Sequence, residues 1–234
     1  MTITITIDNA PHRVKADENL VDAAASVGIY IPTLCYQRGR PCLGTCRLCT
    51  VKIKGHPAAA CTLPVHDNMV VEIHTPELTD MRRALVELLF AEGNHNCPSC
   101  EKSGRCELQA VGYETGMVVS RFPYRYPVRS REERPKRLWL ERDRCIFCLR
   151  CVEFIRDRES DQKIFTIHQR GRHARIDVDV ALADKMSAKQ VSEAAELCPV
   201  GCIIEKGVGY DTPIGQRKFE LKSIRQRTLE GEKR

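Results

Sequence analysis

The stretch CIFCLRC, residues 145–151, places three cysteines at intervals of three residues. These are the first three positions of the C-x2-C-x2-C-x3-C-P run that binds [4Fe-4S] clusters in bacterial ferredoxins. Ile155 and Arg156 stand where the fourth cysteine and its proline belong, whereas Cys198 and Pro199 supply that pair from a distance. No second full run precedes Cys198, so the spacing predicts one [4Fe-4S] cluster here and not two. Its expected ligands are Cys145, Cys148, Cys151 and Cys198.

Residues 95–106, HNCPSCEKSGRC, contain three more cysteines and no nearby fourth. His95 lies two residues before the first of them and is the nearest side chain that could donate a lone pair to iron. A single histidine in a polar loop is more often simply exposed, but this one stands beside a site that lacks one ligand. We expect a second [4Fe-4S] cluster, whose potential the neutral imidazole raises by removing one negative charge. Its expected ligands are His95, Cys97, Cys100 and Cys106.

A third cysteine group lies nearer the N-terminus, in a C-x10-C-x2-C-x11-C arrangement. Plant-type [2Fe-2S] ferredoxins have a shorter first gap but share the cluster-wrapping loop and the distant fourth cysteine. Four thiolates also suit a structural zinc ion, but zinc sites usually have a C-x2-C pair at each end, and this group does not have that arrangement. We therefore expect a [2Fe-2S] cluster. Its expected ligands are Cys35, Cys46, Cys49 and Cys61.

The thirteen cysteines comprise eleven expected ligands and two spares, Cys42 and Cys202. We expect both spares to be small buried residues that do not bind iron, the commoner fate of a free cysteine. An odd number of cysteines fits a secreted disulfide framework badly, and the N-terminus, MTITITIDN, has no signal-peptide pattern. The sequence therefore predicts a reducing, cytoplasmic environment.

The segments around the cysteines predict an α+β chain. Strand-like alternation places Ile3, Ile5 and Ile7 on one face, and one short helix follows. Further on, we expect a helix that is capped by Thr79, carries Leu85, Leu88 and Leu89 on one side and ends at Gly93. An irregular segment broken by prolines follows it. A short strand after Leu138, a hairpin pairing 163–167 with 174–178, and a helix capped by Ser187 complete the pattern. The last dozen residues are strongly charged, so we expect them to be disordered.

These elements predict five segments along the chain. They are a [2Fe-2S] domain at 1–78, a His–Cys [4Fe-4S] segment at 79–120, a linker at 121–137, a ferredoxin-like [4Fe-4S] domain at 138–210 and a C-terminal tail at 211–234.

The charge and the motifs of the chain exclude several classes of function. The net charge is +6, and the 121–137 segment holds seven basic residues against Glu132 and Glu133. Nucleic acid could bind such a segment, but a basic arm that grips an acidic partner protein explains it better. No apolar run is long enough to span a bilayer, so we expect no direct membrane insertion. Neither a G-x-G-x-x-G motif nor a hydrolase motif occurs, so we expect an electron carrier without catalytic residues or a nucleotide site.

The order of the three groups, with MRRALVELLFAEGNHNCPSCEKSGRCELQAVGYE at residues 81–114, resembles the N-terminal portion of the large iron–sulfur subunit of respiratory complex I. Because the chain stops after the third group, it is similar to the small diaphorase (gamma) subunit of cytoplasmic NAD-reducing [NiFe] hydrogenases. In complex I the histidine precedes its first cysteine by four residues, where this chain has Gly93. His95 is thus carried over by role, with a shortened spacing.

The resemblance implies a β-grasp [2Fe-2S] domain, a His–Cys segment and a ferredoxin-like domain. It also implies a flavoprotein partner, the large diaphorase subunit, that carries FMN and exchanges hydride with NAD. The small and large subunits of a [NiFe] hydrogenase would split H2, and the clusters would relay electrons between the two modules.

Two other readings fit the cysteine pattern. The same relay could serve an NAD-dependent formate dehydrogenase, an [FeFe] hydrogenase or another complex I-like enzyme. A zinc-binding interaction protein is an alternative from a different class, and it predicts a colourless product with zinc in place of iron.

Overall fold

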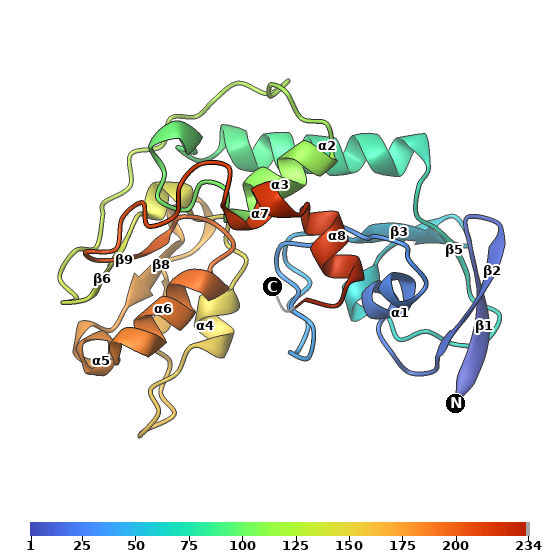
Figure 1. Ribbon diagram of the computed structural model, residues 1–234, viewed down its shortest axis with the longest axis horizontal. Helices are drawn as coiled ribbons and strands as arrows, with labels where there is room; N and C mark the ends of the chain where they lie inside the picture. The colour runs from blue at the N-terminus through green and yellow to red at the C-terminus, as the bar shows by residue number, and fades with distance from the viewer. Residues whose placement is uncertain (233–234) are drawn as a thin grey trace. The chain divides into compact units, whose positions relative to one another are not determined.

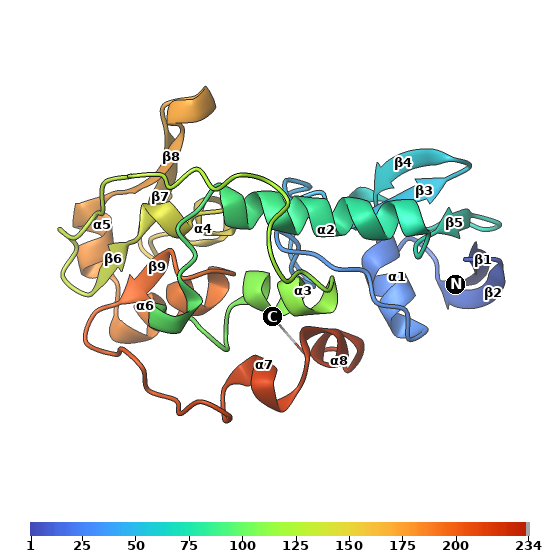
Figure 2. The ribbon, with the colours of Figure 1, turned by 90° about the horizontal axis from the view of Figure 1, so that it is seen from above.

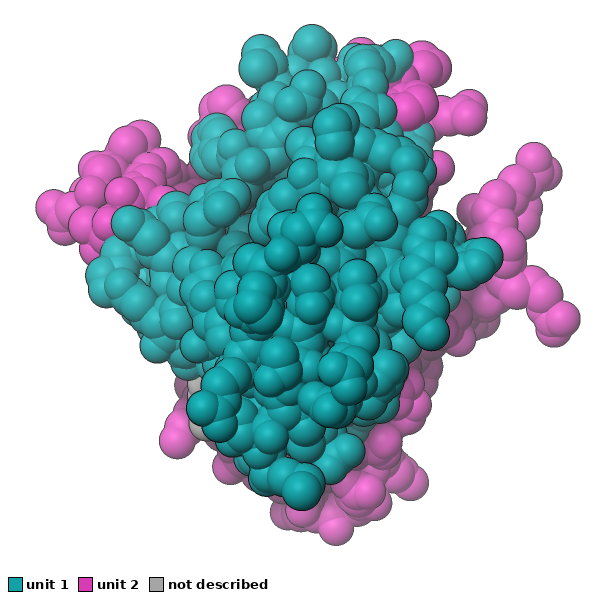
Figure 3. Space-filling model, turned by 90° about the vertical axis from the view of Figure 1, so that its right-hand side faces the viewer, with its two compact units in different colours: residues 1–88, 111–121, 222–234 teal, residues 89–110, 122–221 magenta. Residues whose placement is uncertain are grey.

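The computed structural model describes residues 1–232, which form two compact units (Figure 3). Unit 1 comprises residues 1–88, 111–121 and 222–232, and unit 2 comprises residues 89–110 and 122–221. Helices and small sheets occur in both, so the α+β class expected from the sequence is confirmed. None of the described helices has the length and apolar character needed to cross a membrane.

Unit 1 is built on a mixed five-stranded sheet with the order β2-β1-β5-β3-β4 (Figure 1). β1 pairs with β2 in antiparallel and with β5 in parallel orientation. A hairpin, a helix and a parallel return to the first strand are the elements of the expected β-grasp fold. The strands are β1 (Thr2–Ile7), β2 (Ala10–Lys15), β3 (Thr50–Ile53), β4 (His56–Ala59) and β5 (Val70–Glu72).

The core of this unit forms where α1 (Leu20–Ser26) packs on the sheet. Ile5 and Ile7 are buried and Ile3 is partly buried against the same cluster, which confirms the expected apolar face of the first strand. Asn19 begins the helix because its side-chain oxygen accepts a hydrogen bond from the backbone N–H of Asp22. A short 3-10 turn, η1 (Ala60–Thr62), lies against the helix.

The long helix α2 (Pro76–Ala91) begins earlier than its sequence pattern suggested. Thr75 Oγ1 accepts a hydrogen bond from the backbone N–H of Leu78 at 3.2 Å, and Pro76 takes the first helical position. The expected N-cap, Thr79, is therefore wrong: it lies inside the helix.

The buried face of α2 also differs from the expectation. Leu78, Arg82 and Val86 are buried at helical spacing, whereas Leu88 is 39% exposed and Leu85 is only partly covered. The apolar pattern predicted the wrong buried face, because that face includes Arg82. Its guanidinium donates hydrogen bonds to three backbone carbonyl oxygens, which allows its burial.

The rest of unit 1 contains two helical pieces. α3 (Glu107–Glu114) ends in this unit, and α8 (Ile224–Leu229) contacts α1. A reciprocal pair of hydrogen bonds between Ser223 and Gln226 caps α8. The expected disorder of the last dozen residues is therefore wrong as far as residue 232, and residues 233–234 lie outside the described part of the chain.

Unit 2 holds two small antiparallel sheets, β6 (Leu138–Leu140) with β9 (Ile203–Glu205) and β7 (Phe165–His168) with β8 (Arg175–Val178). The first strand and the hairpin confirm the sequence prediction. The helices are α4 (Arg150–Phe154), α5 (Val180–Lys185), α6 (Ala188–Leu197) and α7 (Lys218–Leu221), and the 3-10 turns are η2 (Cys97–Ser99), η3 (Arg142–Arg144) and η4 (Gly171–His173).

The cap of α6 and the segment before β6 match the sequence prediction. Ser187 forms a capping box with Gln190 at the start of α6, which is visible in orange in Figure 2. In the described chain no helix or strand occurs between α3 and β6, where Pro123, Pro127 and Pro135 interrupt the segment.

Candidate iron–sulfur centres

The first cysteine group lies in unit 1, on the loop that leads into β3 and on the turn η1. Cys35, Cys49 and Cys61 are buried, and Cys46 is partly buried. The backbone N–H of Cys46 points to Cys35 Sγ at 3.5 Å, and that of Leu34 points to Cys46 Sγ at 3.4 Å. Backbone N–H groups directed at sulfur stabilise thiolates, the form that binds iron.

The four sulfur atoms of this group contact one another. Cys49 Sγ lies 3.2 Å from Cys61 Sγ, and the thiols of Cys46 and Cys61 hydrogen-bond to Cys35 and lower the pKa of Cys35. The structure thus brings together all four expected ligands of the [2Fe-2S] site. It adds the spare Cys42, whose thiol contacts Cys61 and whose pKa is raised mainly by burial. Cys42 is only partly buried, so the expectation that both spare cysteines are buried is wrong for this one.

Arg82 of α2 hydrogen-bonds to the backbone on both sides of Cys49. Its guanidinium donates hydrogen bonds to the carbonyl oxygens of Ile73 at 2.8 Å, Thr50 at 2.9 Å and Leu48 at 3.3 Å. Leu48 and Thr50 flank Cys49, so the arginine joins the end of the cysteine loop to Ile73, the residue that follows β5. Burial lowers the pKa of Arg82, but arginine remains charged at any physiological pH.

The second cysteine group lies in unit 2, on η2 and the loop that follows it. Cys100 and Cys106 are buried and Cys97 is partly buried. Burial raises the pKa of Cys97, and it raises the pKa of Cys106 to about 12. The backbone N–H of Gln109, in the first turn of α3, points to Cys106 Sγ at 3.4 Å. These thiols must lose their protons to bind iron, so cluster binding at this site would release protons.

His95 has the features of the missing fourth ligand. Its Nε2 atom is buried without a hydrogen-bond partner, and its ring also bonds to the backbone carbonyl of Leu89. Burial is the main cause that lowers its pKa to about 4, so the imidazole is neutral near pH 7 and offers a lone pair. Phe90 packs edge-on against the ring, with the centroids 5.3 Å apart.

Gly93 gives the His95 ring its room. A Cβ atom at residue 93 would lie 2.4 Å from His95 Nε2 and 2.9 Å from the carbonyl oxygen of Asp143, which is closer than real Cβ contacts occur. The space that a side chain at residue 93 would need is therefore occupied by the His95 ring.

The third cysteine group also lies in unit 2. Cys145 follows η3, Cys148 and Cys151 border the start of α4, and Cys198 ends α6. Leu149 adopts a left-handed conformation, with φ 63°, between two of these cysteines. Burial raises the pKa of Cys148 and of Cys151, and the negative charge of neighbouring cysteines raises both further.

Cys202 belongs to this group in space, which the spacing argument missed. It is buried, as expected, but its thiol hydrogen-bonds to both Cys145 and Cys198. The contact lowers the pKa of Cys145, and it lowers that of Cys198 to about 6. The only sequence signal for this role is its place four residues after Cys198.

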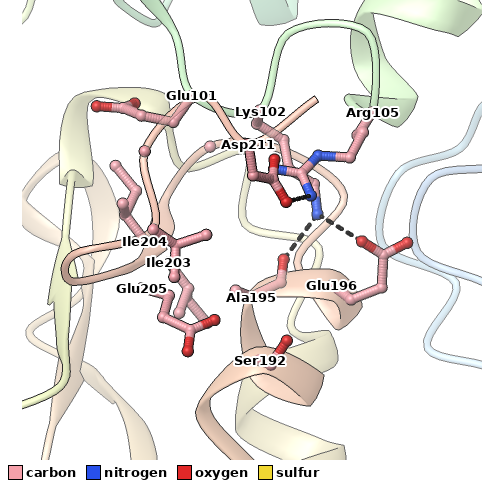
Figure 4. A pocket seen from close by; sticks show the side chains of 13 residues that line it. Glu101, Lys102, Arg105, Ser192, Ala195, Glu196, Ile203, Ile204, Glu205 and Asp211 are labelled. Carbon is pink, nitrogen blue, oxygen red and sulfur yellow. Dashed lines mark hydrogen bonds and ion pairs between the residues drawn. The ribbon is translucent and has the colours of Figure 1, made fainter. Parts of the chain in front are cut away.

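The loop of the second group is tied to α6, which ends at Cys198. Lys102 Nζ donates to the carbonyl oxygen of Ala195 at 2.7 Å and pairs with Glu196 at 3.3 Å, as the dashed lines in Figure 4 show. Lys102, Ala195 and Glu196 all line a cavity of about 120 Å³. The contacts among the cysteines of the first group are hydrogen bonds between thiols. Within residues 1–232, no group of three or more His, Cys, Asp or Glu side chains already has the geometry of a metal site.

Three family models match the chain in order. They describe a 2Fe-2S iron–sulfur cluster binding domain at residues 1–76, an NADH-ubiquinone oxidoreductase-G iron–sulfur binding region at 82–121, and the ferredoxin-like domain of NADH-quinone oxidoreductase subunit 3 at 137–204. The matched residues contain every expected ligand. Together they define an iron–sulfur protein with 2Fe-2S and 4Fe-4S regions.

A relative in Cupriavidus necator, the gamma subunit of the NAD-reducing hydrogenase HoxS, is 62% identical over 99% of both chains. The chain belongs to the family of this gamma subunit. It is also 29% identical, over 94% of its length, to the NADH-ubiquinone oxidoreductase 75 kDa subunit of Reclinomonas americana, of which it spans 31%. A chain from a crystal structure of NAD+-reducing [NiFe]-hydrogenase in the H2-reduced state shares 37% identity, with a TM-score of 0.85 and 95% coverage of both chains.

Proposed function

We propose that this chain is the iron–sulfur electron-transfer subunit of a NAD-reducing [NiFe] hydrogenase. The observation that carries the proposal is the 62% identity, over 99% of both chains, to a gamma subunit of such an enzyme. The 29% identity to the 75 kDa oxidoreductase subunit extends over only 31% of that longer protein and supports the iron–sulfur role alone.

We assign one [2Fe-2S] and two [4Fe-4S] clusters to the chain. The contacts among sulfur atoms support the first and third ligand sets, and the orphaned Nε2 of His95 supports the second. The sets are Cys35, Cys46, Cys49 and Cys61; His95, Cys97, Cys100 and Cys106; and Cys145, Cys148, Cys151 and Cys198. We keep the five segments at 1–78, 79–120, 121–137, 138–210 and 211–234 as the functional division.

The clusters, when bound, accept and release one electron at a time. The chain's own residues hold and tune them: backbone N–H groups point to sulfur at Cys35, Cys46 and Cys106, and hydrogen bonds to sulfur are one of the protein's controls on cluster potential. Neutral His95 removes one negative charge from the second site. The chemistry at either end of the relay belongs to other subunits.

The partners follow from the family. We propose that a diaphorase large subunit carries FMN and exchanges hydride with NAD, and that the small and large [NiFe] subunits act on H2. A cytoplasmic location is consistent with thirteen free cysteines in the described chain, because disulfides form mainly in oxidising compartments.

The metal and flavin content of the native complex tests this proposal. The tagged chain is purified anaerobically with its partners, and iron, nickel, molybdenum, zinc and FMN are measured per complex. Iron together with nickel and FMN supports the hydrogenase. Iron with molybdenum and no nickel would mean that the chain transfers electrons in another enzyme. Zinc without iron would exclude an electron-transfer function.

A further inference from the structure

A buried ion pair joins the loops of the second and third cysteine groups. Arg150 lies between Cys148 and Cys151 and is fully buried, with 0% of its side chain exposed. Its two terminal nitrogens donate to Glu107 Oε1 at 2.7 Å and Glu107 Oε2 at 2.8 Å. Glu107 directly follows Cys106 and is 4% exposed. Each member of the pair therefore lies close in sequence to a proposed cluster ligand.

Backbone groups also join the two cysteine groups at this place, which we call the junction: Glu107 and Arg150 with Leu197 and Pro199. The N–H of Glu107 donates to the carbonyl oxygen of Pro199 at 2.8 Å, and Arg150 also contacts the carbonyl oxygen of Leu197 at 3.4 Å. Leu197 and Pro199 flank the ligand Cys198. A short path thus runs from Cys106 through the N–H of Glu107 to the carbonyl of Pro199 and on to Cys198.

Gly201, in the loop after Cys198, also lies close to a ligand of the second site. A Cβ atom at Gly201 would lie 2.8 Å from Cys100 Sγ, so only glycine lets the loop after Cys198 pass this close to a ligand of the second site. Ligands of the two sites are therefore held by one packed junction.

Arg150 keeps its positive charge at any physiological pH. Two hydrogen bonds, at 2.7 Å and 2.8 Å, join it to the two side-chain oxygens of Glu107, and both side chains are buried. In a site of low dielectric constant, a single charge acts on neighbouring groups far more strongly than it does in water.

We propose that Arg150 and Glu107 form a positioning pair that holds the second and third [4Fe-4S] sites together and balances the charge that both clusters experience. The inference rests on the proposed function, because it requires that both clusters bind. With both clusters bound, one electron would pass between them without bond formation or proton transfer, and the junction would supply the contact path. Neutralising Glu107 removes the carboxylate that pairs with Arg150, so the net charge beside both clusters becomes more positive, which favours the more negative, reduced state of each cluster.

The test is a redox titration of the holo chain, followed by the EPR signal of each cluster. Glu107→Gln preserves the shape of the side chain and is expected to raise the potentials of both [4Fe-4S] clusters, while that of the [2Fe-2S] cluster stays unchanged. Adding Arg150→Met also removes the positive charge, so the net charge of the pair returns to zero, and is expected to return both potentials toward the wild-type values. Such a neutral apolar substitution of a buried pair is often tolerated by the fold.

Glu193→Gln is the matched control, because it removes the same group from an exposed arginine pair in the same unit, with Arg158 at 3.5 Å. No shift is expected there, since solvent and salt screen exposed charges. Iron content and thermal unfolding are measured for every variant.

Four outcomes decide between the explanations. A rise with Glu107→Gln that the double variant reverses supports the charge-balancing role. Unchanged potentials, or a shift that persists in the double variant, would assign the pair a purely structural role and overturn the inference. If Glu107→Gln does not fold, the double variant alone decides: potentials far from wild type overturn the inference, and potentials near wild type support it. Two missing [4Fe-4S] signals in the wild-type chain would instead refute the proposed function.

Discussion

Replacing Arg82 with methionine should destabilise unit 1 and loosen its iron site. The arginine is 5% exposed and donates hydrogen bonds to Leu48, Thr50 and Ile73, which join the end of the cysteine loop to the sheet. Methionine keeps an unbranched, mostly apolar side chain, although a shorter one, and removes the charged donor group. The three carbonyl oxygens then lose a charged partner inside the protein.

The size of the effect follows from these contacts. A hydrogen bond to a charged group contributes about 1.5–3 kcal/mol, and a buried polar atom left without a partner costs about 1–3 kcal/mol. The contact to Leu48 is long at 3.3 Å, and contributions in one network are not additive. We therefore expect a loss of about 3–5 kcal/mol, a large share of the roughly 5–15 kcal/mol typical of a folded domain.

Urea unfolding of the wild-type and Arg82→Met chains measures this loss. Visible circular dichroism should show the [2Fe-2S] signal disappearing at lower urea in the variant. The control is Arg83→Met on the same helix, because Arg83 is only partly buried and donates to the single carbonyl of Thr115 at 3.1 Å. A loss below about 1 kcal/mol, or equal losses for both variants, would refute the reasoning.

Three further predictions concern charge and ligand identity. The hydrogen bond from Arg134 holds the pKa of Glu132 at about 2, below its usual 4.5, so the stabilisation is complete above pH 4.5 and is lost as pH falls toward 2. Glu132→Gln should remove this acid dependence from a plot of Tm against pH, and an unchanged plot would contradict it. His95→Cys should keep the second cluster and lower its potential in a redox titration, because a thiolate adds one negative charge; an unchanged potential would make His95 a bystander. Cys198→Ser combined with Cys202→Ala should remove the EPR signal of the third cluster alone, and loss of the [2Fe-2S] signal instead would show that the ligands are grouped wrongly.

Cysteine spacing is the basis of the ligand prediction, because a cluster needs thiolates at positions set by the chain's local path. For the first group, the structure places the sulfur atoms of the predicted ligands in contact. The ring of His95 occupies the space that a side chain at residue 93 would need, which is a local constraint that the sequence pattern did not show. Local hydrogen bonds likewise explain why the cap at Ser187 was predictable.

The features that the sequence did not predict depend on contacts between distant residues. Glu107 and Arg150 are 43 positions apart, and nothing in either local pattern announces their pairing. The apolar pattern of α2 favoured Leu85, Leu88 and Leu89, whereas the sheet placed Arg82 on the buried face. A charged side chain goes there only when tertiary structure supplies its partners, and a hydrophobic pattern cannot show those partners.

The most direct test of the central claim is the iron and labile sulfide content of the anaerobically purified chain, together with EPR spectra during stepwise reduction. One [2Fe-2S] and two [4Fe-4S] clusters predict a brown protein with about ten irons and three reduced signals that appear at separate potentials. A colourless protein with about three zinc ions per chain would contradict the account.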